Sequence, residues 1–165
     1  MDFWWIDEPS VLGGANPTIW QLKGLYRVGF RSVVFLIDGM EQAPGYNVDA
    51  VKNMGFRHFP IFIRDFSAPC LEDFELVLTT VDWALGQGKG KVYIHCEDGF
   101  RGTGIIGAAY WVYKGSTIRE AVQTILESNP EALDVLQQQE KGLSKLEELA
   151  ESSQHLRENA CSWLK

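Results

Sequence analysis

The residues from His95 to Gly104 combine a cysteine, an arginine and a threonine with several glycines. A cysteine thiolate is a nucleophile, a guanidinium can hold two oxygens of one anion, and glycines let a loop curl with its N–H groups inward. The run 91–94 before the cysteine predicts a buried strand, and the apolar run 105–114 after it predicts a helix. We therefore expect the cysteine where a strand ends and a helix begins, at a place that favours anions.

Three side chains of this loop are candidates for chemistry. Cys96 is the candidate nucleophile, and Arg101 is the candidate clamp for phosphoryl oxygens. Thr103 offers a hydroxyl that could hydrogen-bond the thiolate and help it leave in a hydrolysis step. The roles of Cys96 and Arg101 each have a structural alternative. Cys96 could be a buried thiol at the end of a strand, and Arg101 could form a surface ion pair with Glu97 or Asp98.

Length and composition limit the class of protein. A chain of 165 residues predicts one domain over 1–165, long enough to bury a core. The net charge of −7, without a basic cluster in the sequence, argues against binding of nucleic acid, so an anion site must depend on local geometry. We see no membrane span, no signal peptide, no disulfide framework and no zinc-ligand spacing. We expect a cytoplasmic monomer with no metal, no cofactor and no membrane partner.

The hydrophobic pattern alternates between strand and helix periods. Strands are expected over 3–6, 10–13, 32–37, 56–60 and 91–95, and helices over 17–28, 48–54, 71–85, 104–114 and 117–128. Asn16 is the expected N-cap of the first helix, and 61–69 is expected to be a loop. Residues 131–165 have a helical pattern, in which 151–165 is either an extra helix or a frayed tail. This order predicts an α/β domain with a small, mostly parallel central sheet flanked by helices on both faces.

The loop resembles that of a known family. His95-Cys96, Gly99 three residues after the cysteine, and Thr103-Gly104 look like the phosphate-binding loop of the cysteine-dependent protein tyrosine phosphatases, especially small dual-specificity members such as those of archaea. The likeness covers roughly residues 10–150. It implies hydrolysis of phosphotyrosine, with phosphoserine and phosphothreonine as further substrates, through a cysteinyl-phosphate intermediate. The implied partner is a phosphorylated protein or a small phosphomonoester.

The resemblance also implies roles for residues. The segment 61–69 is similar to the family's general-acid loop, which makes Asp65 the implied acid, with an ionised surface carboxylate as the alternative. The segment 129–140 is similar to the one that carries water-orienting glutamines, and Gln138 is the implied one; a polar helix face is the alternative. His95 is expected to arrange the loop. The implied phosphate-binding residues are Glu97, Asp98, Gly99, Phe100, Arg101 and Gly102.

The loop departs from the family pattern at one position. The family's arginine stands six residues after the cysteine, where this chain has Gly102, and Arg101 comes one residue early. Glu97 and Asp98 also place two carboxylates near the mouth, where they oppose a phosphate dianion and raise the pKa of the cysteine. Two alternatives follow: a catalytically impaired pseudophosphatase that binds phosphorylated partners, and a rhodanese-like sulfurtransferase, which shares the shorter spacing from cysteine to arginine.

Overall fold

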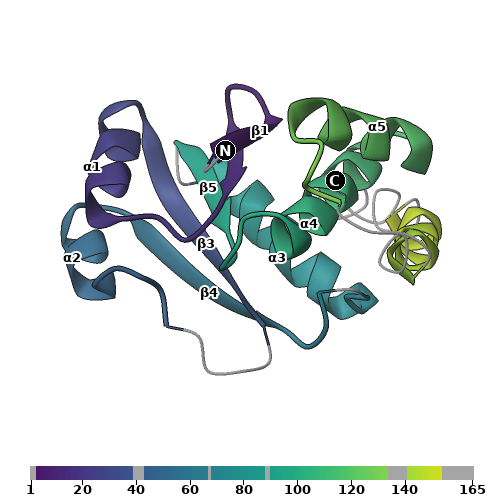
Figure 1. Ribbon diagram of the computed structural model, residues 1–165, viewed down its shortest axis with the longest axis horizontal. Helices are drawn as coiled ribbons and strands as arrows, with labels where there is room; N and C mark the ends of the chain where they lie inside the picture. The colour runs from purple at the N-terminus through teal and green to yellow at the C-terminus, as the bar shows by residue number, and fades with distance from the viewer. Residues whose placement is uncertain (1–2, 39–42, 67, 88–89, 134–140, 154–165) are drawn as a thin grey trace, which may run out of the picture.

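A single five-stranded sheet forms the centre of the protein (Figure 1). The computed structural model describes residues 3–38, 43–66, 68–87, 90–133 and 141–153. The strand order is β1-β2-β5-β3-β4; β1 pairs with β2 in antiparallel fashion, and all other neighbours are parallel. The strands are β1 Phe3–Asp7, β2 Val11–Gly14, β3 Phe30–Asp38, β4 Arg57–Ile63 and β5 Lys91–His95. The prediction of an α/β fold with a mostly parallel sheet is confirmed.

Helices cover both faces of this sheet (Figure 1). One face packs against α1 and α2, and the other against α3, α4, α5 and a helix over 141–153. The labelled helices are α1 Ile19–Arg27, α2 Val48–Asn53, α3 Leu71–Gly86, α4 Arg101–Lys114 and α5 Ile118–Ser128. The capping box predicted at Thr117 and Glu120 is present at the start of α5. The two layers bury most of the side chains of the central strands β3 and β5.

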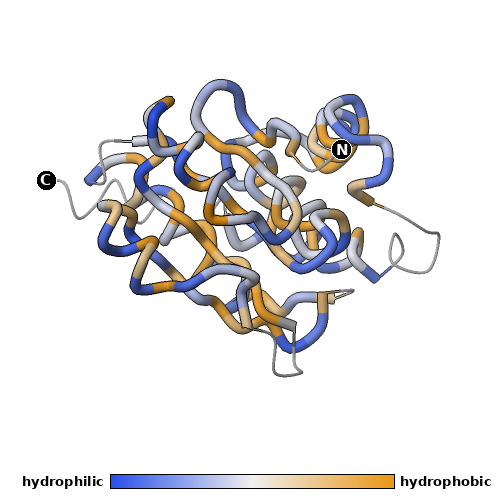
Figure 2. Tube along the Cα trace, turned by 60° about the vertical axis from the view of Figure 1, so that its left-hand side comes forward, coloured by the Kyte–Doolittle hydropathy of each residue, from blue (hydrophilic) through white to orange (hydrophobic). Residues whose placement is uncertain are grey.

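The central strand β3 shows why its sequence is almost continuously apolar. Successive side chains of a strand point to opposite faces, so a strand with helices on both sides must be apolar at every position. Val33 faces the cluster under α1 and α2, whereas Val34 and Leu36 face the cluster under α3, α4 and α5. Figure 2 shows the same arrangement as hydrophobic strands inside a more hydrophilic outer layer.

The first helix begins two residues later than the sequence predicts. Thr18, not Asn16, is the N-cap, and its hydroxyl accepts the Gln21 N–H while the Gln21 side chain accepts the Thr18 N–H at 2.8 Å. The Asn16 side chain instead accepts the Gly45 N–H at 3.0 Å, from a segment far along the chain. The prediction was wrong because this long-range hydrogen bond removes Asn16 from the helix end.

The segment 61–69 is not a loop throughout. β4 continues through Ile63, and Ile61 to Ile63 pair in parallel register with Leu36 to Asp38 of β3. The extension buries Ile61 and Ile63 and leaves Phe62 exposed. The predicted end at Pro60 was wrong, because Pro60 lies in an edge strand, where a missing N–H donor is tolerated.

The C-terminal region is described in part. Residues 141–153 are helical, with Leu146 and Leu149 buried in the core, as the pattern predicts, whereas residues 131–133, also expected to be helical, form a turn. The remaining part of 151–165, like Gln138, lies outside the described residues. None of the described helices has the length and the apolar character needed to cross a bilayer.

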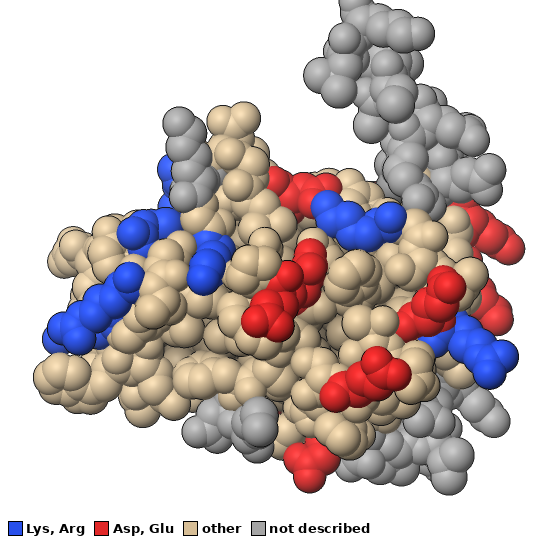
Figure 3. All heavy atoms as spheres, turned by 90° about the horizontal axis from the view of Figure 1, so that it is seen from above, with Lys and Arg blue, Asp and Glu red and all other residues tan. Residues whose placement is uncertain are grey.

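Charge is unevenly spread on the surface shown in Figure 3. Most of the lysines and arginines in this view gather on the side of α1 and α2, whereas acidic side chains spread over the middle and the opposite side. The net charge of −7 is therefore not a guide to the field at a particular site.

Replacement of Gly104 by Ala should destabilise the fold. A Cβ at position 104 would lie 1.6 Å from the carbonyl oxygen of Ala132, and backbone cannot yield as a side chain can. We expect a loss of about 2–3 kcal/mol in the free energy of unfolding, measured by urea denaturation. Gly24→Ala is the matched control, because a Cβ there meets nothing within 4 Å and the helix α1 should gain about 0.5–1 kcal/mol. Equal stability of the two variants would contradict the described contact.

Candidate active site

Cys96 lies directly after β5, between the parallel neighbours β2 and β3. It is 1% exposed. The loop after it turns at Gly99, whose φ of +79° suits glycine, and a Cβ there would lie 2.4 Å from the Ala15 nitrogen. The Trp4 indole donates to the Gly99 carbonyl at 3.0 Å, which ties the loop to β1. The loop is therefore packed against Trp4 of β1 and against Ala15, which directly follows β2.

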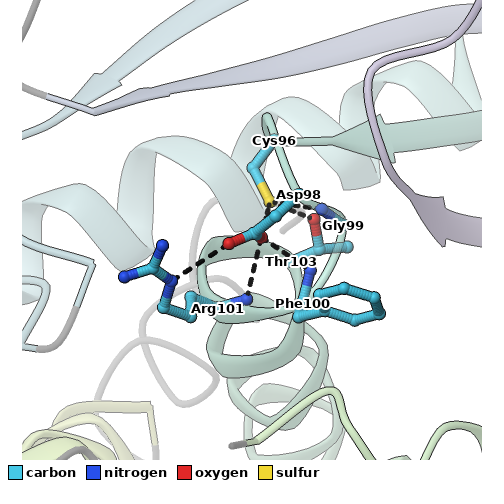
Figure 4. Close-up of polar contacts among 6 residues, drawn as sticks. All are labelled: Cys96, Asp98, Gly99, Phe100, Arg101 and Thr103. Carbon is cyan, nitrogen blue, oxygen red and sulfur yellow. Dashed lines mark hydrogen bonds and ion pairs between the residues drawn. The ribbon is translucent and has the colours of Figure 1, made fainter.

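Three groups contact the Cys96 sulfur (Figure 4). The Thr103 hydroxyl donates to it over 3.1 Å and the Gly99 N–H over 3.3 Å, while the thiol can donate to Asp98 Oδ1 at 3.4 Å. Burial raises the pKa of the thiol, and the negative charge of Asp98 raises it further; the hydrogen bonds from Thr103 and Gly99 oppose this but do not outweigh it. In this state Cys96 is a protonated thiol with two donors already aimed at its sulfur.

The Asp98 carboxylate occupies the N-terminus of α4. Its Oδ1 accepts the Phe100 N–H at 2.9 Å and the Arg101 N–H at 3.3 Å, and its Oδ2 accepts from Arg101 Nε at 3.0 Å. Burial raises the pKa of this carboxyl, but these hydrogen bonds and the Arg101 charge more than compensate, so the pKa is lowered. The N-terminus of α4 thus holds a negatively charged side chain next to the Cys96 sulfur.

The Arg101 side chain points outward and is 63% exposed (Figure 4). Its ion pair with Asp98 is the structural alternative considered for it from the sequence. At the next position, where the family has its arginine, a Cβ on Gly102 would meet the Phe66 ring at 3.0 Å. A side chain at position 102 would therefore press on the Phe66 ring, and Arg101, one residue earlier, pairs with Asp98 instead.

Phe66 also locates the Asp65 segment. Asp65 is exposed just after β4, and its neighbour Phe66 packs against the loop at Gly102 and against the core. The segment that carries the implied acid is therefore in contact with the segment that carries Cys96. The structure does not describe Gln138.

Glu97 contributes through its backbone and turns its carboxylate away from the thiol. Its carbonyl accepts the Asn16 N–H at 3.3 Å, and its side chain accepts from Asn16 Nδ2 at 3.4 Å. Asp98, not Glu97, is therefore the carboxylate that acts on the sulfur.

His95 has a network that the sequence does not reveal. Its Nε2 lies 2.8 Å from the Tyr46 hydroxyl, which lies 2.9 Å from His58 Nε2, and its ring is stacked between Phe35 and Tyr93. Burial lowers the pKa of His95 to about 3, so the ring is neutral and is too weak a base to take the proton of Cys96. A buried histidine needs a partner, but nothing in the sequence indicates Tyr46.

Within the described part of the chain, no group of three or more His, Cys, Asp or Glu side chains is arranged to hold a metal ion. Thiol, hydroxyl, guanidinium and backbone N–H groups are the chemical means that the site offers. Together they suit attack on an anionic ester by sulfur.

Comparison with known proteins agrees with this chemistry. Residues 9–116 match a family model described as a polymorphic toxin system DSP-PTPase phosphatase. The chain belongs to this family. The match separates the chain from the rhodanese-like sulfurtransferases, whose spacing from cysteine to arginine it shares, and it confirms the resemblance to cysteine-dependent dual-specificity phosphatases.

Solved structures show the same architecture. Tk-PTP in its active form is similar at 29% identity and a TM-score of 0.73, over 91% of this chain and 97% of that one. PTPMT1 has the same fold at 19% identity and a TM-score of 0.76, over 93% of this chain and 99% of that one. Human DUSP28 shares the fold at 16% identity and a TM-score of 0.69, over 93% and 96% of the two chains.

The neutral His95 ring should make the fold less stable in acid. The pKa of His95 is about 3 in the folded protein and 6.5 ordinarily. Below pH 6.5 this histidine is therefore protonated in the unfolded chain but stays neutral in the folded protein. The contribution of the neutral ring to the free energy of unfolding is complete above pH 6.5 and declines as the pH falls toward 3. At roughly pH 5 it is smaller by about 2 kcal/mol. Urea unfolding above pH 6.5 and at roughly pH 5 measures this difference.

The His95→Asn variant is the control for this pH dependence, because asparagine does not titrate. Whatever its stability at neutral pH, the variant should lose less free energy of unfolding between the two pH values than the wild type loses. An identical pH dependence in both proteins would contradict the neutral buried ring.

Proposed function

We propose that this protein hydrolyses phosphate monoesters through a covalent phosphocysteine on Cys96. The observation that carries the proposal is the position of the Asp98 carboxylate. It lies 3.4 Å from the sulfur and is held by two N–H groups of α4 and by Arg101. These groups form an anion site next to a nucleophile, which is what transfer of a phosphoryl group to sulfur requires.

Before the first step the Cys96 thiol gives up its proton to solvent, and the resulting thiolate attacks phosphorus. The S–P bond forms, the bond from phosphorus to the leaving oxygen breaks, and that oxygen takes a proton from Asp65. Arg101 and the N–H groups at the start of α4 stabilise the charge on the three remaining oxygens. Thr103 and Gly99 already donate to the sulfur, so they stabilise its thiolate form.

In the second step water attacks the phosphocysteine. Asp65, now a carboxylate, takes a proton from the water, the P–S bond breaks, and inorganic phosphate leaves. The Thr103 hydroxyl, 3.1 Å from the sulfur, stabilises the departing thiolate. Gln138 is the proposed residue that orients the water. The cycle needs no metal ion or organic cofactor, because every proton and electron pair is supplied by the chain and by water.

The proposed substrates are phosphotyrosine in proteins, phosphoserine and phosphothreonine, or a small phosphomonoester. The thiol must stay reduced to act, and both described cysteines, Cys70 and Cys96, are free. A reducing compartment such as the cytoplasm is therefore proposed, with the protein acting as a monomer.

Hydrolysis of p-nitrophenyl phosphate should depend on Cys96 and Arg101. Cys96→Ser should abolish turnover, because a serine hydroxyl in this loop is a far weaker nucleophile. Arg101→Ala should lower kcat/KM by about two to four decades, the loss of roughly 3–5 kcal/mol of transition-state stabilisation. Initial rates of p-nitrophenol release measure both effects.

Arg101→Lys is the matched control, since it keeps the charge and loses the planar fork; its rate should lie between wild type and Arg101→Ala. Wild-type turnover no faster than that of Cys96→Ser would contradict the proposed enzymatic activity. It would favour the alternative, a catalytically impaired protein that binds phosphorylated partners. Full activity in Arg101→Ala would contradict the role of the guanidinium.

Asp65→Asn should distinguish substrates by their leaving groups. p-Nitrophenolate leaves without much help, whereas the tyrosyl oxygen of a phosphotyrosine peptide needs a proton. We expect kcat to fall by about 10²-fold or more on the peptide and by clearly less on p-nitrophenyl phosphate. Glu72→Gln, an exposed acidic position in the first turn of α3, is the matched control. An equal loss on both substrates would contradict the acid role.

A further inference from the structure

We propose that Asp98 is an internal ligand of the phosphate loop, which competes with the phosphoryl group of the substrate and must leave before it can bind. The inference rests on the proposed function of the loop and concerns the regulation of that same site. In the resting enzyme, the Asp98 side chain occupies the groups that would otherwise bind phosphate.

The first argument is the identity of the donors. The groups that would hold a phosphoryl group are the N–H groups at the start of α4, the arginine and the nucleophilic sulfur. In the structure the Phe100 and Arg101 N–H groups and Arg101 Nε all donate to the Asp98 carboxylate, and the Cys96 thiol lies 3.4 Å from it. Phosphate and this carboxylate cannot use the same hydrogens at once.

The second argument is access to the sulfur. Cys96 is 1% exposed, whereas the Asp98 side chain, which contacts it, is 34% exposed (Figure 4). Asp98 therefore lies on the outer side of the thiol. A phosphorus atom that is to bond with the sulfur must therefore come close to the Asp98 carboxylate, which lies 3.4 Å from the sulfur.

The third argument concerns charge. A carboxylate beside the thiol disfavours the thiolate, and it repels a phosphate dianion by like charge. Departure of Asp98 removes both penalties and frees Arg101 Nε for a phosphoryl oxygen. This would explain an arginine at position 101. There it can pair with Asp98 in the resting state and with the phosphoryl group when substrate is bound.

A purely structural reading makes a different prediction. α4 has Phe100 at its N-cap position, a residue that cannot cap, so Asp98 supplies the missing acceptor. If this were its only role, its removal would weaken the loop and would not improve the binding of phosphate. The two readings therefore predict opposite signs for the same measurement.

The test measures binding of inorganic phosphate by calorimetry in the full-length Cys96→Ser protein, with and without Asp98→Asn. Asparagine keeps an oxygen acceptor for the Phe100 and Arg101 N–H groups but removes the charge. We expect phosphate to bind about tenfold more tightly. Glu147→Gln, which removes one charge from an exposed position on the 141–153 helix, is the matched control and should leave the affinity unchanged.

Asp98→Ala provides a second variant, because it removes the acceptor altogether. It should unfold at a lower temperature without phosphate, and added phosphate should raise its melting temperature more than that of the parent. In the protein with native Cys96, Asp98→Asn should also speed alkylation of the Cys96 peptide by iodoacetamide at neutral pH, as followed by mass spectrometry.

The outcomes separate the two proposals. Phosphate affinity that is unchanged or weaker in Asp98→Asn overturns the internal ligand, even when the wild type hydrolyses p-nitrophenyl phosphate. Tighter phosphate binding in Asp98→Asn supports the internal ligand, even when neither protein turns over substrate. Absence of turnover would contradict only the proposed hydrolysis.

Discussion

The structure depends on how the N–H groups at the start of α4 are satisfied. The first turn of a helix has N–H groups without partners inside the helix, and in a partly buried loop they need an acceptor. Here the acceptor is the Asp98 carboxylate, which contacts the Cys96 sulfur and Arg101 as well. This set of donors thus accounts for the position of the Asp98 carboxylate and for the orientation of Arg101, whereas burial is the main reason that the pKa of the thiol is raised.

The sheet and its helices hold these donors in place. Cys96 follows the strand between β2 and β3, so its position is set by hydrogen bonds on both sides. The Trp4 indole and the backbone of Ala15 restrict the loop at Gly99, and Ala132 closes on the first turn of α4 at Gly104. A nucleophile needs such rigid support, because small misplacements of a reacting atom cost large factors in rate.

The exchange of arginine and glycine at 101 and 102 has a structural counterpart. A Cβ at position 102 would meet the ring of Phe66, from the segment that carries Asp65. The contact ties that segment to the loop after Cys96, whereas Arg101, one residue earlier, pairs with Asp98 from the exposed side. In this chain glycine at 102 and arginine at 101 therefore both fit their surroundings, the first against Phe66 and the second against Asp98.

Local sequence determined the elements and the character of the site. Alternation of apolar runs and breakers is a short-range property, so the strand before Cys96, the helix after it and the capping box at Thr117 follow from neighbouring residues. Long-range contacts decided the rest. Only the fold brings Gly45 to the Asn16 side chain, pairs residues 61–63 with β3, and places Tyr46 between His58 and His95. The tertiary structure also shapes the loop that carries Asp98, because Trp4 and Ala15, far away in the sequence, contact it at Gly99.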